Sequence, residues 1–558
     1  MCVVTCVVTC VFAWAVPTMR VGAADLAVGL PDVTPQQGAA LVALAHAAMT
    51  DYLHSRTAPA SVKIPTELRE LGRRPNAVAI TLRRDGSVVA VEVHSNADLC
   101  TNLIIAALKA MRSPKLPDHV DDKVLAGLTV EVEVLGKPRP ITPSQVDQAI
   151  VPGLTGLQCG SGSSTVHVLP SAAYVLGLSP EQMLRGAMLR MQRAAEPQSQ
   201  STGADGQLAV FEARHYVGRF GSPAFELCRG KISPAAPELD DKAALAAAVS
   251  IGRYLAAHQE ADGWFTVGDG ETTPVDQLYV TWALARLAAR QPSPVLAESV
   301  KRALVAAGTR VVRSRGQAVV RADSPDDTLA ATALLTLALE TDRTKQAVEL
   351  RRELLAGLTA SLDAPAPQPG GRPATVAAAK QHRITRGKCL AAMALATDPA
   401  CQPFLASARR EMLPARPATA EEALWKFRAG VAESWPPEFG EPNSPVGLAL
   451  QGPAGPVDNR GGFSIGAQPP RTDITGLAAA CMEQLLARQS GIPPATAAAL
   501  ARQLAEARGF CANMIYQPKE AYFAADPNTW AGAVRATPGS AAATAQSCAA
   551  AIEALIRG

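Results

Sequence analysis

The sequence predicts a multidomain protein: an α+β domain over residues 31–230, then an all-α domain of about six helix pairs over residues 242–558. One observation is length, because 558 residues exceed what a single hydrophobic core usually organises. Another is that the first part alternates apolar and polar residues between tight-turn signals. The third is a repeat in the second part. A glycine turn, a polar loop, a proline with an aspartate and an apolar helix return after Gly263, Gly316 and Gly371, at intervals of roughly 54 residues.

Composition excludes several classes of function. The net charge of +3 is spread along the chain, which argues against a nucleic-acid surface. The 11 cysteines show no paired C-x-x-C spacing, so we expect no zinc or redox motif, no other metal site and no cofactor. Nothing in their spacing requires disulfides.

Residues 1–30 can be interpreted in two ways. Val3 to Val16 is apolar but too short to span a bilayer comfortably, and small residues at Val21–Ala24 could be cut by a signal peptidase. This predicts an exported or periplasmic protein. No Lys or Arg precedes the apolar run, however, and Met19 could be the true start, which would leave a cytoplasmic protein.

The elements of the α+β domain follow from local patterns. Asp85-Gly86 predicts the tight turn of a hairpin over Asn76–Val93. Strict alternation over Leu128–Leu135 predicts a strand with one buried and one wet face. Strands are also expected over Gly153–Cys159, Thr165–Leu169 and Leu208–Phe225, and helices over Thr34–Leu53, Leu99–Met111 and Ser179–Met191.

Residues 34–228 resemble the AMMECR domain family. The likeness rests on the opening helix, ITLRRDG, LTVEVEVL, PITPSQVDQAIVPGLTGLQCG and VHVLPSAAYVLGLSPEQML. The family's Leu-Arg-Gly-Cys-Ile-Gly stretch is replaced here by Ser87–Glu92, without its arginine or cysteine. The resemblance therefore implies a structural or partner-binding module, and no functional residue is carried over.

Two histidines of the first domain, and the segment that connects it to the second, also carry predictions. His94 and His167 lie on strands without a titratable partner at readable spacing, so we interpret them as face residues that bind no metal. Pro, Gly and charged residues over Arg229–Asp241 predict a linker at 231–241, with domains separable near Pro234.

The helices of the second domain alternate in character. Leu329–Leu339 is almost free of charge, whereas Glu298–Arg313 and Lys345–Leu358 are charged on one side. Helices that are apolar all round must be covered, so the alternation predicts inner helices ringed by outer ones. Inner helices are expected to start near residues 276, 327, 384, 419, 473 and 540.

This layering and Gln259–Trp264 resemble the α/α toroid of terpenoid cyclases and protein prenyltransferases, over Ala243–Leu555. Other toroids, including glycan hydrolases and lyases, share the architecture. The chemistry of the two named families is not supported. Asp323–Asp327 lacks the Asp-x-Asp-Asp spacing of the cyclases, and no zinc-binding set of aspartate, cysteine and histidine is present.

A candidate ligand site lies where the inner helices begin. Aspartates, arginines and aromatic residues recur there, and ring closure would bring them together: Trp264, Asp276, Asp327, Arg386, Phe463, Arg471, Asp473 and Arg535. The alternative is that the aspartates cap their helices and the aromatic residues pack the turns.

Two functions remain open. One is a binding or scaffold protein, with the toroid holding an unknown protein or small-molecule ligand. The other is a carbohydrate- or lipid-acting enzyme that uses paired carboxylates inside the toroid. Neither requires nucleic acid or a stable membrane span.

Overall fold

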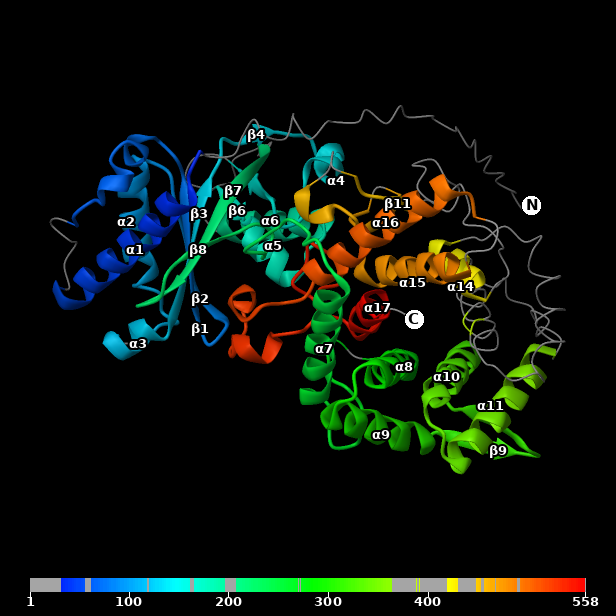
Figure 1. Ribbon diagram of the computed structural model, residues 1–558. Helices are drawn as coiled ribbons and strands as arrows, with labels where there is room; N and C mark the ends of the chain where they lie inside the picture. Colours follow the sequence, from blue (N-terminus) through cyan, green and yellow to red (C-terminus); the bar gives the residue numbers. More distant parts are fainter. Residues whose placement is uncertain are drawn as a thin grey trace, which may run out of the picture.

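A computed structural model describes residues 32–55, 62–117, 120–160, 165–195, 207–268, 270, 272–363, 388, 391, 419–429, 448–452, 456–466, 468–488 and 492–556, without the side chains of 193–195. The segment at 1–30 and the candidate Arg386 lie outside these residues. A sheet domain, residues 32–230, is followed by a helical domain, residues 231–556 (Figure 1).

The sheet domain is built on an antiparallel sheet of 8 strands in the order β2-β1-β3-β7-β5-β6, with β4 and β8 each paired to β7. Helices α1 and α2 pack on each other and on its strands, and α6 packs on β5 and β6. The strands are β1 (Val78–Arg84), β2 (Ser87–His94), β3 (Leu128–Leu135), β4 (Arg139–Pro140), β5 (Thr155–Cys159), β6 (Val166–Val168), β7 (Leu208–Arg219) and β8 (Phe225–Leu227). The helices are α1 (Pro35–Ser55), α2 (Leu99–Ala110), α3 (Asp122–Ala126), α4 (Val146–Ala149), α5 (Pro170–Leu176) and α6 (Pro180–Ala195).

The hairpin prediction is confirmed. Asp85 and Gly86 join β1 to β2 with φ angles of 49° and 76°, the left-handed pair that a two-residue hairpin turn requires. Gly86 has a second reason to be glycine. A Cβ there would lie 2.5 Å from the backbone oxygen of Phe523, so the C-terminal part of the chain touches this turn.

The prediction of one wet face on β3 is wrong, because all eight residues of the strand are buried. Helices of the sheet domain cover one face. On the other, Glu131 and Glu133 are 0% and 1% exposed and bond to groups of their own domain. Tyr522, from the helical domain, packs beside them against His215, with ring centroids 5.5 Å apart. The second face is therefore covered by a segment that is distant in sequence.

The helical domain has two layers of helices among its described residues. The inner helices contact each other in the sequence α10, α8, α17, α15, α14, and α7, α9, α11 and α16 pack on their outer side. Residues 364–387 and 392–418 lie outside the description, so the closed ring of about six pairs remains a prediction. The bounds are α7 (Asp241–Ala257), α8 (Pro274–Arg290), α9 (Pro294–Gly308), α10 (Pro325–Ala338), α11 (Lys345–Asp363), α14 (Ala420–Arg428), α15 (Thr472–Arg488), α16 (Pro494–Asn513) and α17 (Ala545–Leu555).

The predicted helix over Glu298–Arg313 is too long. Helix α9 ends at Gly308, and Val311–Ser314 forms β9, which pairs with β10 (Gln317–Val320). Arg315 and Gly316 turn the chain with φ angles of 51° and 78°. The two adjacent valines in β9 favour a strand, and the turn fixes the hairpin.

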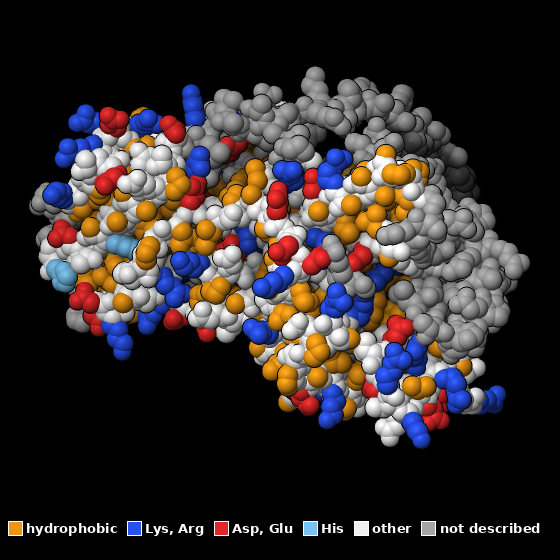
Figure 2. Space-filling model, in the orientation of Figure 1, with side chains coloured by type: hydrophobic (Ala, Val, Ile, Leu, Met, Phe, Trp, Pro, Cys, Tyr) orange, Lys and Arg blue, Asp and Glu red, His pale blue; other side chains and the backbone are white. Residues whose placement is uncertain are grey.

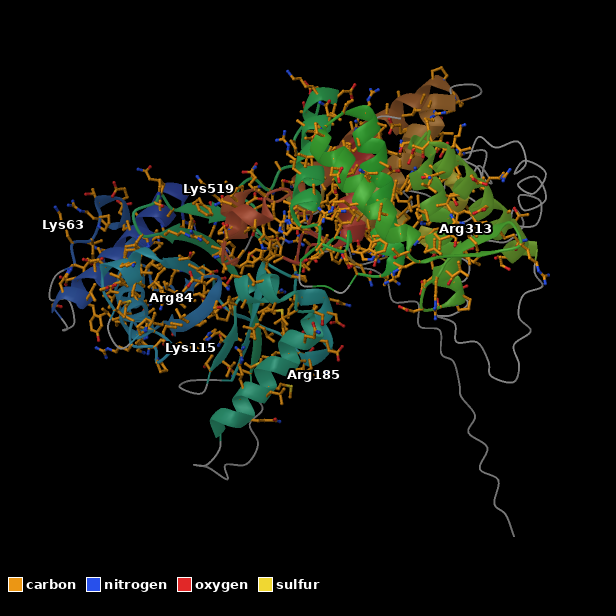
Figure 3. The ribbon with its side chains drawn as sticks, turned by 90° about the horizontal axis from the view of Figure 1, so that it is seen from below. Lys63, Arg84, Lys115, Arg185, Arg313 and Lys519 are labelled. Carbon is orange, nitrogen blue, oxygen red and sulfur yellow. The ribbon has the colours of Figure 1, made fainter. Side chains whose placement is uncertain are left out.

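The segment between α16 and α17, residues 514–544, joins the two domains. In Figure 3 the part around Lys519 lies against the sheet domain. The Tyr174 and Tyr516 hydroxyls are 2.9 Å apart, and the Ala541 amide donates to the Tyr174 carbonyl at 2.9 Å. We call residues 514–544 the bridging segment.

The predicted linker at 231–241 is packed rather than free. Lys231 is 3% exposed, and its Nζ donates to Glu520 Oε2 at 2.6 Å. Asn513 Nδ2 donates to the Pro234 carbonyl at 2.9 Å. In contrast to the composition-based prediction of separable domains, we expect a chain cleaved near Pro234 to elute as one complex in gel filtration.

His46 on α1 gives a pH-dependent prediction. Its ring stacks on Phe220 at 4.0 Å, and burial lowers its pKa from 6.5 to about 4. The unfolded chain binds this proton first as pH falls, so the stabilisation is present above about pH 6.5 and lost towards pH 4. The unfolding free energy of the original protein should fall as the pH is lowered through this window. In His46→Gln we expect that fall to be smaller by about 2 kcal/mol, as measured by urea unfolding at both ends of the window.

The control for this measurement is His54→Gln. His54 lies on the same helix with a side chain that is 63% exposed. It should keep the pH dependence of the original protein. Equal slopes for His46→Gln and His54→Gln would contradict the prediction.

Candidate functional site

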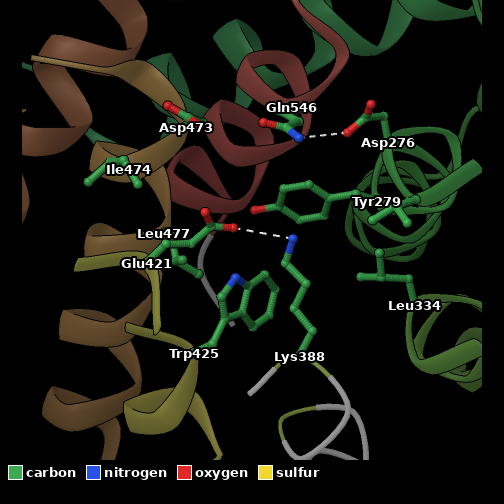
Figure 4. A pocket seen from close by; sticks show the side chains of 11 residues that line it. Asp276, Tyr279, Leu334, Lys388, Glu421, Trp425, Asp473, Ile474, Leu477 and Gln546 are labelled. Atoms are coloured by element: carbon green, nitrogen blue, oxygen red, sulfur yellow. Dashed lines mark hydrogen bonds and ion pairs between the residues drawn. The ribbon is translucent and has the colours of Figure 1, made fainter. Parts of the chain in front are cut away.

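A pocket opens where the inner helices begin (Figure 4). Asp276 of α8, Glu421 of α14, Asp473 of α15 and Gln546 of α17 line it, each from the first turn of its helix. Lys388 joins them, with Nζ 3.2 Å from the Glu421 carboxylate. First turns carry the positive end of the helix dipole, which stabilises carboxylates there.

Asp276 caps its helix and also bridges to another. Its Oδ2 accepts hydrogen bonds from the Thr273 amide at 3.1 Å and hydroxyl at 2.8 Å, completing a capping box. Its Oδ1 accepts from Gln546 Nε2 at 2.7 Å. The expected capping contact is therefore present, and the other carboxylate oxygen bonds to Gln546, the residue of α17 that lines the pocket.

Asp473 is held by its neighbour Arg471. The guanidinium donates from Nε at 3.0 Å and from Nη2, which fixes the carboxylate in a two-point contact. Burial would lower the pKa of Arg471, but Asp473 outweighs it and the net direction is up. Each carboxylate oxygen keeps a free lone pair, so Asp473 can still accept from a ligand.

The floor of the pocket holds two buried donors. Trp425 is 2% exposed and Tyr279 8% exposed. Trp425 Nε1 and the Tyr279 hydroxyl have no hydrogen-bond partner among the described residues. Burial raises the pKa of Tyr279, so its hydroxyl stays protonated. Unpaired buried donors cost free energy, and a ligand oxygen would satisfy them.

The enclosed space is small. It measures ≈ 20 Å³, which is room for about one or two water-sized groups. A single hydroxyl or hydroxymethyl group fits inside, while a larger ligand would extend into the mouth beside the carboxylates.

The other candidates lie elsewhere. Asp327 lies in the first turn of α10, where Ser324 is the N-cap, and its carboxylate accepts from the Ser324 hydroxyl at 2.8 Å. Trp264 lies beneath the Arg310 guanidinium, 5.8 Å from its ring centroid, and Phe463 is a core residue at 1% exposure. Arg535 is fully buried and donates to the Arg229 carbonyl at 2.8 Å. Of the predicted set, Asp276 and Asp473 line the pocket and Arg471 orients Asp473.

Sequence reasoning missed Tyr279, Glu421, Trp425, Lys388 and Gln546. The available signal was position rather than residue type. Glu421 and Gln546 occupy the first turn of an inner helix, as Asp276 does. Tyr279 and Trp425 follow about one turn later, and at that spacing they share the face of the acidic residue.

Among the residues that the structure describes, no group of three or more His, Cys, Asp or Glu side chains could hold a metal ion. No described helix is both long and apolar enough to cross a bilayer. His167 lies on β6 with its ring edge-on to Phe211 at 5.9 Å. Charges of both signs are mixed over the face seen in Figure 2.

No family model matches the chain, and no curated protein matches it. Among solved structures, the chain is similar to an uncharacterised protein from Pyrococcus horikoshii, at 21% identity over 35% of this chain and 98% of that chain, with a TM-score of 0.30. It is also similar to a family 76 glycoside hydrolase from a bovine Bacteroides thetaiotaomicron strain, at 8% identity over 76% and 95% of the two chains, TM-score 0.29. A metagenome-derived family 9 endoglucanase matches at 12% identity over 72% and 80%, TM-score 0.24.

Proposed function

We propose that the protein binds a polyhydroxylated, carbohydrate-like ligand at the pocket formed by the starts of the inner helices. The observation that carries this is that two buried donors without a partner among the described residues, Trp425 Nε1 and the Tyr279 hydroxyl, line the same pocket as the carboxylates of Asp276, Glu421 and Asp473. A ligand hydroxyl accepts one hydrogen bond and donates another, so adjacent hydroxyls satisfy both kinds of group.

Other ligand classes fit less well. A lipid chain would leave the floor donors unpaired and desolvate the carboxylates. An anion would be repelled by the three carboxylates. The two cations, Lys388 and Arg471, already have carboxylate partners and would not offset that repulsion. A neutral polyol avoids both penalties.

The wider architecture belongs to the same proposal. We propose that residues 242–558 close into an α/α toroid with this pocket at its turn end, and that residues 31–230 form an AMMECR-like module. The layered inner and outer helices support the first part. The order of helix, hairpin and strand in the sheet domain supports the second.

The test is a calorimetric titration of the full chain with a panel of mono- and oligosaccharides, together with tryptophan fluorescence to report on Trp425. Asp473→Asn should weaken binding of a hit by about 10- to 100-fold, because a hydrogen bond to a charged acceptor contributes roughly 1.5–3 kcal/mol. The amide keeps much of the local geometry, so the unfolding free energy should fall by at most about 1 kcal/mol.

Asp327→Asn is the matched control. Like Asp473, Asp327 lies in the first turn of an inner helix shortly after a proline, but it does not line the pocket. It should lose similar stability and bind normally. Equal weakening by both substitutions, or no saccharide binding at all, would reject the proposal.

A second measurement distinguishes an enzyme from a protein that only binds the saccharide. Hits are incubated with the protein, and the release of reducing ends is followed over time. Turnover that is absent from Asp276→Asn and Asp473→Asn even at saccharide concentrations that saturate these variants would identify the two carboxylates as reacting groups. Binding without turnover supports the binding function.

A further inference from the structure

The enclosed part of the pocket at the starts of the inner helices limits which part of a ligand can enter it. Its volume of ≈ 20 Å³ is room for about one or two water-sized groups, which is too little for a sugar ring. A carbohydrate can therefore place only a group that projects from its ring in this space, while the ring itself stays in the mouth beside the carboxylates. The walls decide which projecting group fits.

Much of the wall is aliphatic. Val275 of α8, Leu334 of α10, and Ile474 and Leu477 of α15 line the pocket, and none of them is more than 8% exposed. Figure 4 shows Ile474 and Leu477 on one side of the space and Leu334 on the other. Aliphatic side chains bury a methylene group favourably, but they leave a polar group at the same place without a partner. The wall therefore favours a projecting group that contains a carbon atom.

The same space holds hydrogen-bond donors. The Tyr279 side chain is 8% exposed, and its hydroxyl bonds to none of the described residues. Figure 4 shows this side chain reaching from α8 into the pocket, with its oxygen directed away from its own helix and towards the side of Glu421 and Trp425. Trp425 Nε1 is the second donor in the same condition. Two such donors in one pocket call for an oxygen acceptor.

The usual substituents of a sugar ring meet these two demands unequally. A hydroxyl on the ring brings an oxygen without a methylene, and a methyl group leaves both donors unpaired. A carboxylate would be repelled by the carboxylates of Asp276, Glu421 and Asp473. A hydroxymethyl group brings one methylene and one oxygen, and these two atoms also suit the volume.

This inference rests on the proposed function: we propose that the pocket recognises the exocyclic hydroxymethyl group of a hexopyranose. The hydroxymethyl oxygen accepts from the Tyr279 hydroxyl and Trp425 Nε1, and the methylene lies against the aliphatic wall. The ring hydroxyls donate to the carboxylates at the mouth. The protein therefore prefers hexoses to pentoses, 6-deoxyhexoses and uronic acids.

The probes are the methyl glycosides of glucose, galactose and mannose, each compared with its 6-deoxy analogue by calorimetric titration of the full chain. The members of a pair differ in one oxygen atom. The glycoside that binds most tightly should lose affinity by about 10- to 100-fold in its 6-deoxy form, because the buried donors are then left unpaired. Sorbitol has hydroxymethyl ends without a ring, and it should bind more weakly than that glycoside because its open chain must be ordered.

Tyr279→Phe tests the contact itself. The hydroxyl has no partner among the described residues, so its removal should not lower the unfolding free energy. It should reduce the preference for the glycoside over its 6-deoxy analogue by at least about fivefold, whereas a purely structural defect would weaken both ligands equally. Tyr522→Phe is the matched control. The Tyr522 hydroxyl is also buried without a described partner, but it lies outside the pocket, so this variant should keep the full preference.

The outcomes separate this inference from the function on which it rests. Equal binding of a glycoside and its 6-deoxy analogue, or an unchanged preference in Tyr279→Phe, would overturn the hydroxymethyl assignment and leave a carbohydrate-binding pocket. Sorbitol that binds as tightly as the glycoside would overturn the assignment to a hexose ring. No binding of any saccharide would overturn both proposals.

Discussion

A Glu553→Ala variant is expected to lose about 3–5 kcal/mol of unfolding free energy, because it leaves buried arginine charge without its partner. Glu553 of α17 is 1% exposed. Its carboxylate accepts from Arg286 Nη1 at 2.7 Å and from Arg428 Nη2 at 2.8 Å. Burial would raise the pKa of Glu553, but the two arginines outweigh it and the net direction is down.

Aromatic rings cannot replace this carboxylate. The Arg428 guanidinium lies 4.7 Å from the Trp282 ring centroid and 5.7 Å from that of Trp425, and its Nε and Nη1 have no partner among the described residues. A desolvated cation–π contact contributes roughly 2 kcal/mol, less than the about 3–5 kcal/mol that is lost when one partner of a buried ion pair is removed.

Urea unfolding at neutral pH measures the effect. Glu298→Ala is the control, since Glu298 pairs with Lys301 on the surface and its side chain is 62% exposed. It should change the unfolding free energy by less than about 0.5 kcal/mol. The double variant Glu553→Leu with Arg428→Met should recover most of the loss. A loss below about 1 kcal/mol in Glu553→Ala would contradict the account.

The second large effect is expected at the contact between the domains. Glu520 of the bridging segment is 1% exposed and pairs with Lys231. Glu520→Ala leaves a buried lysine charge, at a cost of about 3–5 kcal/mol near pH 7. Because the pair holds the chain that leaves the sheet domain against the bridging segment, the loss should also appear as faster hydrogen exchange in residues 228–234 and in the bridging segment.

The pH dependence of this variant has a definite sign. Burial, assisted by Arg535, lowers the pKa of Lys231 to about 8 from 10.5, and Glu520 opposes that shift. Between those values the unfolded chain binds more protons, so stability rises with pH through the window. Above about pH 9 the lysine of the folded protein is neutral with or without Glu520, so the defect of Glu520→Ala should shrink. A defect that is constant from pH 7 to about 10 would show that lost packing, not charge, is responsible.

Local chemistry accounts for what the sequence could predict. The Asp85-Gly86 turn was predicted because both residues tolerate a positive φ. The starts of α8, α10 and α15 were predicted because a proline and an aspartate mark the first turn of a helix. Asp276 and Asp473 were placed at one end of the domain for the same reason, although Asp276 also has the capping role that was the alternative and Asp473 is paired with Arg471.

Long-range contacts account for what was missed. Nothing within Leu128–Leu135 indicates that Tyr522 covers its polar face. Arg535 follows a repeated turn, which suggested the ligand site, but its guanidinium points to Tyr174 and Arg229 of the sheet domain. Pairs that are 306 and 342 residues apart leave no periodic pattern in the chain. The connection at residues 231–241 has the composition of an exposed linker although Lys231 within it is buried, so composition could not reveal that it is packed.

Because the bridging segment is near the end of the chain, the sheet domain is covered only late in synthesis. The ribosome completes the sheet domain long before it reaches Glu520, which lies 289 residues after its partner Lys231. At the usual 5–20 residues per second, that interval lasts about 15–60 s. During it the polar side of the sheet, with Glu131, Glu133 and His215, has no cover from Tyr522. The nascent sheet domain should therefore stay protease-sensitive and depend on chaperones until the end of the chain emerges, although it is first in sequence.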